Sequence, residues 1–186
     1  MSGGTTPPRI PLLERDQVTP EVANVYDALL KTRGVVPNMF KTLAHTPALA
    51  LAAAGYLKAL LSDGALRGFY KELIAMRLSV LLSSEYAVIA HALSARQKGA
   101  TEAQIAAARA DFESGPFTVA EKLGFRAAER LHHSAAEIDD AFFAELKQNF
   151  TDPQIIELIA TAAAFELFPR FVDALRIPIT PNPSNV

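Results

Sequence analysis

The sequence contains no cysteine among its 186 residues. Without thiols the chain can form no disulfide and can offer no thiolate to a metal ion. The same absence excludes any reaction that cycles between a dithiol and a disulfide. It does not identify the cellular compartment, because proteins of every compartment can lack cysteine.

An excess of charge of either sign is also missing. Eighteen Lys and Arg residues stand against 20 Asp and Glu residues, which gives a net charge of -2. No run of Lys or Arg marks a local basic patch, so we expect no binding to nucleic acid.

Long apolar runs are absent as well. The longest, from Pro47 to Leu61, is interrupted by Lys58 and is shorter than the roughly 20 residues that cross a bilayer. The opening residues, MSGGTTPPRI, lack the basic and apolar segments of a secretory signal. We therefore expect a cytoplasmic protein without membrane contact.

Half of the residues are hydrophobic, and the mean hydropathy is +0.16. This is high for a small soluble monomer, and surplus apolar surface favours association of subunits. We therefore expect a homo-oligomer.

Start and stop signals of helices recur along the whole chain, and no segment alternates as a strand does. Thr19-Pro20 begins a helix that Gly34 ends, and capping boxes begin at Thr101 and Thr118. Further helices are predicted over residues 38–45, 47–62, 66–82, 85–98, 102–112, 119–133 and 139–149, and from residue 152 onward. Pro169 should kink or split the last helix.

This pattern predicts an all-α, single-domain helical bundle of about seven to nine helices. The single domain covers residues 1–186. Residues 1–15 and 178–186 are expected to form extended arms, because prolines interrupt both segments.

Glu72 and His91 are the candidate catalytic pair. The helices predicted over 66–82 and 85–98 form an antiparallel pair joined by Ser83-Ser84. Glu72 lies ~15 Å before the turn and His91 ~10 Å after it, at ~1.5 Å per residue, so the two lie at similar heights. His91 could then act as an acid–base group oriented by Glu72. A buried pair with a structural role alone is the alternative.

Mostly small side chains surround His91 on one face of its helix, a pattern that leaves either a tight helix contact or a cavity. The positions that share this face are Ser84, Ala87, Val88, His91, Ser94 and Ala95.

The series Glu72-x11-Ser84-x2-Ala87-x3-His91 resembles the motif Glu-x11-Cys-x2-Cys-x3-His of the carboxymuconolactone decarboxylase and alkylhydroperoxidase D family. Ser84-Glu85-Tyr86 also resembles the thiol-free members of that family. So do the stretches 34–38, 45–47, 95–96 and 99–105. The resemblance implies an alkylhydroperoxidase D-like helical fold whose central hairpin carries the active site. It also implies assembly as a dimer, trimer or hexamer.

In the thiol members, two cysteines reduce a hydroperoxide while the histidine and glutamate move protons. Ser84 and Ala87 stand at both thiol positions here, so dithiol peroxidase activity is excluded. The decarboxylase branch needs acid–base groups instead, and many thiol-free members carry glutamate at the position of Ala87. Glu85 does not replace that group, because it points about 200° away around the helix.

We therefore predict lyase- or decarboxylase-type acid–base chemistry on a small carboxylated or carbonyl-containing molecule. The alternative is a non-catalytic, ligand-binding member that carries a peroxidase-related label by homology. Besides catalytic Glu72 and His91, the predicted pocket and substrate-binding residues are Arg77, Ser84, Glu85, Tyr86 and Ala87. We expect no cofactor and no metal, because no histidines have the spacing of a metal site.

Overall fold

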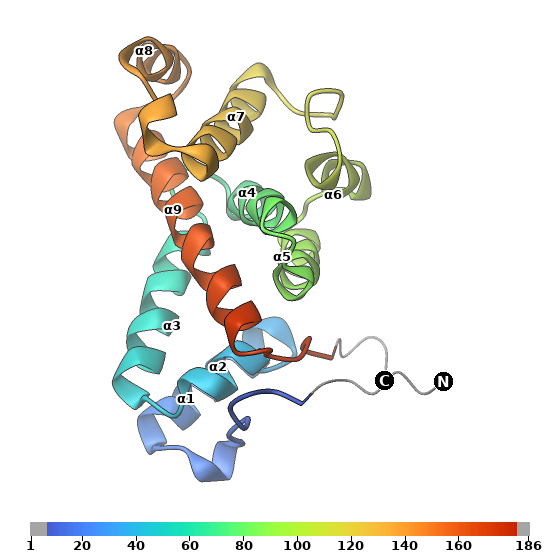
Figure 1. Cartoon of the computed structure of the whole chain (residues 1–186), viewed down its shortest axis with the longest axis vertical. Coiled ribbons are helices and arrows are strands. Elements are labelled where there is room, and N and C mark those ends of the chain that lie inside the picture. The colour runs from blue at the N-terminus through green and yellow to red at the C-terminus, as the bar shows by residue number, and fades with distance from the viewer. Residues whose placement is uncertain (1–6, 182–186) are drawn as a thin grey trace. The chain divides into compact units, whose positions relative to one another are not determined.

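The computed structural model describes residues 7–181, and within that range every regular element is helical. The elements in chain order are η1 (Arg15–Gln17), α1 (Pro20–Arg33), α2 (Asn38–Leu43), α3 (Pro47–Leu61), α4 (Gly68–Leu81), α5 (Glu85–Gln97), α6 (Glu102–Arg109), α7 (Val119–His133), η2 (Ala135–Glu137), α8 (Asp140–Asn149) and α9 (Asp152–Ala174) (Figure 1). The nine α-helices of the described residues confirm the predicted all-α class.

Helix boundaries follow the predicted caps closely. Pro20 opens α1, and Gly34 ends it in the left-handed conformation at φ 73°, with its N–H bonded to the carbonyl of Leu30. Both predicted capping boxes are present, at Thr101 before α6 and at Thr118 before α7. The local sequence alone therefore determines most of the helix starts.

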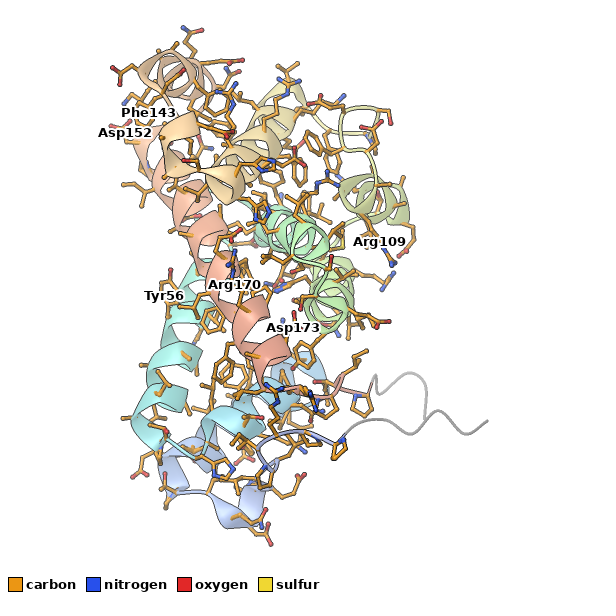
Figure 2. The ribbon with its side chains drawn as sticks, in the orientation of Figure 1. Tyr56, Arg109, Phe143, Asp152, Arg170 and Asp173 are labelled. Carbon is orange, nitrogen blue, oxygen red and sulfur yellow. The ribbon has the colours of Figure 1, made fainter. Side chains whose placement is uncertain are left out.

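Two helix ends differ from the prediction. Helix α6 stops at Arg109 rather than near Phe112, and Figure 2 labels Arg109 where the helix ends. Arg77 accounts for this end, because its Nη1 reaches the carbonyl of Ala110 at 3.1 Å and satisfies a group that a longer helix would have used. Helix α9 runs through Pro169 without a split, since proline removes only one hydrogen bond of a long helix.

The chain forms two compact units, Met1–Ala59 with Phe171–Val186, and Leu60–Arg170. The predicted single-domain organisation stays a prediction. None of the helices within residues 7–181 has both the length and the hydropathy needed to cross a membrane.

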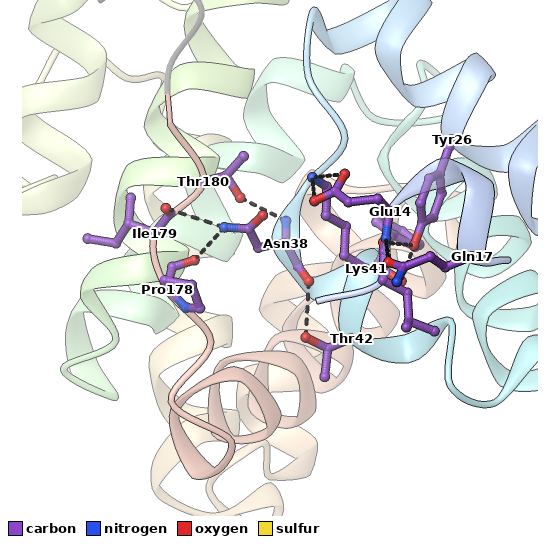
Figure 3. A network of polar contacts seen from close by, with 11 residues as sticks. Glu14, Gln17, Tyr26, Asn38, Lys41, Thr42, Pro178, Ile179 and Thr180 are labelled. Atoms are coloured by element: carbon purple, nitrogen blue, oxygen red, sulfur yellow. Dashed lines mark hydrogen bonds and ion pairs between the residues drawn. The ribbon is translucent and has the colours of Figure 1, made fainter. Parts of the chain in front are cut away.

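The first unit ties the described parts of both expected arms to its helices (Figure 3). The amide of Leu13 donates to the carbonyl of Lys41, and Asn38 bonds to the hydroxyl of Thr180 and to the carbonyl of Pro178. Tyr26, buried in α1, donates its hydroxyl to the carbonyl of Leu13. The remaining arm residues, 1–6 and 182–186, lie outside the described residues.

The second unit is built around α4, which packs against α5, α6 and α7. Helix α4 is buried on nearly every side, as expected for a central helix. Its buried residues are Gly68, Tyr70, Lys71, Glu72, Leu73, Ile74, Ala75, Met76, Leu78 and Ser79. The chain has thus placed two charged side chains, Lys71 and Glu72, in the middle of its core.

The turn between α4 and α5 is a Schellman motif. Ser84 N–H bonds to the carbonyl of Ser79 at 2.9 Å, and Ser83 N–H bonds to that of Val80 at 3.0 Å. Ser83 occupies the left-handed position with φ 57°, where glycine is usual because it has no Cβ to clash. The turn is therefore well bonded but strained at one residue.

We expect Ser83→Gly to raise the free energy of unfolding by about 0.5–1 kcal/mol, because glycine removes the Cβ strain at the left-handed position. Urea unfolding followed by circular dichroism measures the change. Ser114→Gly is the control, since Ser114 has a negative φ and should gain nothing. A stability of Ser83→Gly equal to or below that of the wild type would contradict the strain argument.

Lys71 is the second charged residue of α4, and its ammonium pairs with Glu157 of α9. Lys71 Nζ lies 2.8 Å from Glu157 Oε2, and the side chain of Lys71 is 0% exposed. Glu157 also accepts the amides of Ala65 and Leu66 at 2.9 and 3.0 Å. Burial by itself would raise the pKa of Glu157, but Lys71 and the two amides hold that pKa below its ordinary value of 4.5.

A lowered folded-state pKa gives stability that is present above pH 4.5 and is lost as the pH falls through the folded pKa. We expect Glu157→Gln to flatten this acid dependence and to lower the free energy of unfolding by about 3 kcal/mol, because Lys71 stays buried without its partner. Urea unfolding between pH 3 and pH 7 measures both effects.

Two variants control for this prediction. Glu113→Gln breaks a half-exposed pair with Arg126 and should cost less than about 1 kcal/mol. Adding Lys71→Met to Glu157→Gln should recover part of the loss, because it removes the unpaired charge. Similar losses for Glu113→Gln and Glu157→Gln would show that burial of Lys71 is not the cause.

Candidate active site

Glu72 lies in the centre of α4 with a side chain that is 0% exposed. Three donors from α5 and its C-terminal end reach its carboxylate. Ser94 Oγ and Lys98 Nζ donate to Oε1 at 2.6 and 2.5 Å, and His91 Nδ1 donates to Oε2 at 2.7 Å. A buried carboxylate is stable only with such compensation, so the three donors and the carboxylate form one unit.

His91 is held in a defined orientation by two contacts. Its Nδ1 bonds to Glu72, and its ring stands edge-on to the ring of Phe165 in α9, with centroids 4.4 Å apart and planes at 85°. The predicted juxtaposition of Glu72 and His91 across the helical hairpin is therefore confirmed. Which proton the imidazole carries is assigned from its acceptor: a carboxylate beside Nδ1 selects the tautomer with hydrogen on Nδ1.

This tautomer leaves the lone pair of Nε2 as the reactive end of the imidazole. The side chain of His91 is 10% exposed, and the described contacts engage Nδ1 and the ring rather than Nε2. The arrangement can therefore accept or deliver a proton at Nε2 while Glu72 stabilises the charge on the ring.

Lys98 was missing from the predicted site, and Ser94 was placed only on the same helix face. Lys98 follows α5 as its C-cap residue and also donates to the carbonyl of Leu61 at 2.7 Å. A signal was available: His91, Ser94 and Lys98 follow one another at spacings of three and four, which places them on one face of a helix.

Three of the five predicted pocket residues are buried at the start of α5. They are Ser84, Tyr86 and Ala87. Ser84 Oγ has no hydrogen-bond partner within residues 7–181, although Ser84 is 0% exposed and occupies the N-cap position. Glu85 is exposed, so the structure places it apart from the buried carboxylate.

Arg77, the fifth residue, points to a different part of the unit. Its Nε donates to Glu129 of α7 at 2.6 Å, its Nη1 reaches the end of α6, and its guanidinium lies 5.5 Å from the ring centre of Phe112. These contacts occupy the donors that a substrate carboxylate would need.

A second imidazole–carboxylate pair occurs between α7 and α9. His132 Nδ1 lies 2.7 Å from Glu166 Oε1, and Arg170, labelled on α9 in Figure 2, holds the other oxygen of Glu166 at 2.7 Å. This pair is partly exposed rather than buried. It provides an internal comparison for the buried pair, with the same distance in a wetter environment.

One protein family matches the chain. Residues 47–130 match the carboxymuconolactone decarboxylase family, a range that contains Glu72, His91, Ser94 and Lys98. No curated protein shows significant sequence similarity to the chain.

Solved structures share the fold over nearly the whole chain. An uncharacterized peroxidase-related protein from Ralstonia eutropha JMP134, with an alkylhydroperoxidase AhpD core, is 24% identical and covers 96% of this chain and 95% of its own, with a TM-score of 0.86. An uncharacterized peroxidase-related protein from Silicibacter sp. TM1040 is 21% identical over 94% of this chain and 95% of its own, with a TM-score of 0.84. The debrominase Bmp8 in complex with 2,3,4-tribromopyrrole is 23% identical over 95% of this chain and 94% of its own, with a TM-score of 0.82. At these identities the structures establish the fold, which is the predicted alkylhydroperoxidase D-like bundle.

Proposed function

Because the match over residues 47–130 places this chain in the carboxymuconolactone decarboxylase family, we propose that it is a proton-transfer enzyme of lyase or decarboxylase type. Its substrate is a small carboxylated or carbonyl-containing molecule. His91 is the acid–base group, and Glu72 orients it. The observation that carries the proposal is the 2.7 Å bond from His91 Nδ1 to a fully buried carboxylate.

The geometry supports a defined proton step. His91 Nε2 takes a proton from a carbon next to a carbonyl, and the electrons of the C–H bond pass into the enolate. The imidazolium then returns the proton to another atom of the same molecule, which gives an isomer. In a decarboxylation the C–C bond to the carboxylate breaks, its electrons form the enolate, and an imidazolium protonates that carbon. Both routes use the same two side chains.

The alternative is a ligand-binding member without turnover. The burial of His91 and the absence of a polar group at Ala87 favour it, because substrate needs access to Nε2 and a second acid–base group is lacking. The debrominase structure holds a small ring-shaped molecule in the same fold, so the size of ligand is the same in both proposals.

We further propose that the protein acts as a cytoplasmic homo-oligomer, a dimer, trimer or hexamer. Large apolar side chains are exposed on both α3 and α9, in support of subunit contacts. The most exposed of them are Leu49, Tyr56, Ile156 and Leu167.

The proposed activity predicts a large effect of His91→Gln. In a panel of lactones and β-keto acids followed by absorbance and by release of CO2, the variant should lower kcat by about 10²–10⁴-fold, because the proton donor and acceptor is gone. Glu72→Gln should also lose activity, because an amide that donates to Nδ1 favours the wrong tautomer.

His132→Gln is the matched control, since it removes an imidazole that bonds to a glutamate at the same 2.7 Å but lies outside the site. It should leave kcat unchanged. Equal rates for wild type and His91→Gln would remove His91 from the mechanism. Binding of the same compounds by the wild type without turnover would support the ligand-binding alternative.

A hydroperoxide assay checks the exclusion of thiol chemistry. With cumene hydroperoxide and a dithiol reductant, the protein should show no turnover above the uncatalysed rate, because the chain has no cysteine to oxidise. A cysteine-dependent peroxidase in the same mixture is the positive control. Robust dithiol-dependent turnover would contradict the exclusion.

A further inference from the structure

The geometry points to Lys98 as the residue that sets the protonation state of the Glu72–His91 pair. We infer that the Lys98 ammonium neutralises Glu72 and so keeps His91 in its neutral form, with Nε2 ready to take a proton. Lys98 is thus a positioning residue that makes His91 a base. The inference concerns the same site as the proposed function and rests on it for the chemistry, but its main test needs no substrate.

Lys98 is fixed at both of its acceptors. It stands at the C-terminal end of α5, and its Nζ lies 2.5 Å from Glu72 Oε1 and 2.7 Å from the carbonyl of Leu61. Its side chain is 33% exposed, whereas that of Glu72 is 0% exposed. The lysine therefore keeps its charge at little desolvation cost while it neutralises a carboxylate that has none of its surface in water.

The charges of the cluster give the direction of the effect. With Glu72 ionised and Lys98 protonated, a neutral imidazole leaves the buried group with no net charge. A proton added to His91 would bring a second positive charge to the same carboxylate, in a region where unbalanced charge is costly. Without Lys98, the imidazolium becomes the partner that balances Glu72.

The other groups around His91 do not supply this charge. From α4 the imidazole meets the Glu72 carboxylate, from α5 Ser94 shares that carboxylate as a neutral donor, and from α9 it meets the ring of Phe165. Lys98 is the cation that these contacts bring to Glu72, and it binds the oxygen opposite the one that His91 uses.

This assignment narrows the chemistry of the proposed function. A neutral His91 begins the reaction as a base, so the substrate class is a carbon acid with a C–H bond next to a carbonyl. The C–H electrons pass into the enolate, and the proton resides on Nε2 until it is returned to the molecule. Loss of CO2 without prior proton removal would instead need His91 to begin as imidazolium.

The test is the ¹⁵N spectrum of the His91 ring, which distinguishes the two neutral tautomers and the imidazolium. His91→Gln identifies the signal among the four histidines. At one fixed neutral pH, Lys98→Met should raise the ratio of imidazolium to imidazole at His91 about tenfold over wild type, since a positive charge that opposed protonation is gone. Lys98→Arg, which keeps the charge, should stay close to wild type.

Lys122→Met is the matched control. Lys122 Nζ also donates to a backbone carbonyl, that of Glu113, at 2.5 Å, but it lies outside the site. It should leave the His91 ratio unchanged. An unchanged ratio in Lys98→Met would overturn the inference, and so would a Lys98→Arg ratio that matches that of Lys98→Met. Thermal unfolding of each variant confirms that the spectra come from folded protein.

With a substrate in hand, the pH dependence of kcat/KM adds a second readout. The limb that rises with pH should move to higher pH in Lys98→Met and stay in place in Lys122→Met, which a purely structural role would not produce. If no compound is turned over, the proposed function fails while the ¹⁵N result still decides the role of Lys98.

Discussion

The structure of the second unit depends on the neutralisation of a carboxylate at the centre of α4. A glutamate with no exposed surface is stable there only because an ammonium, a hydroxyl and an imidazole surround it. All three donors come from α5 and its C-terminal end. The polar contact that a catalytic role requires is therefore also the contact that joins the two central helices.

The neighbouring residue of α4 follows the same rule in the opposite sense. Lys71 is as buried as Glu72, and Glu157 of α9 neutralises it together with two backbone amides. The central helix thus carries two adjacent charges of opposite sign, each paired with a different helix. Two such pairs specify which helices face α4 more strictly than apolar packing does, because a charge without its partner is costly in a core.

Much of this could be predicted from residues that act locally. Caps such as Gly34, Thr101 and Thr118 act within one turn of helix, so the number and type of elements were predictable. The heights of Glu72 and His91 followed from counting residues along a hairpin. The contacts of Arg77, the burial of Lys71 and the reach of Lys98 to Leu61 were not predictable, because each depends on a partner distant in sequence.

The Schellman turn at Ser83 has a consequence for the evolution of the site. Each residue of an α-helix turns the chain by about 100°, so a single insertion between α4 and α5 would rotate the whole face that bears His91, Ser94 and Lys98 away from the carboxylate. Substitutions can accumulate on this hairpin, as Ser84 and Ala87 at the two thiol positions illustrate, but a change in its length would dismantle the proton machinery at one stroke. The connecting turn is therefore free in composition and fixed in length.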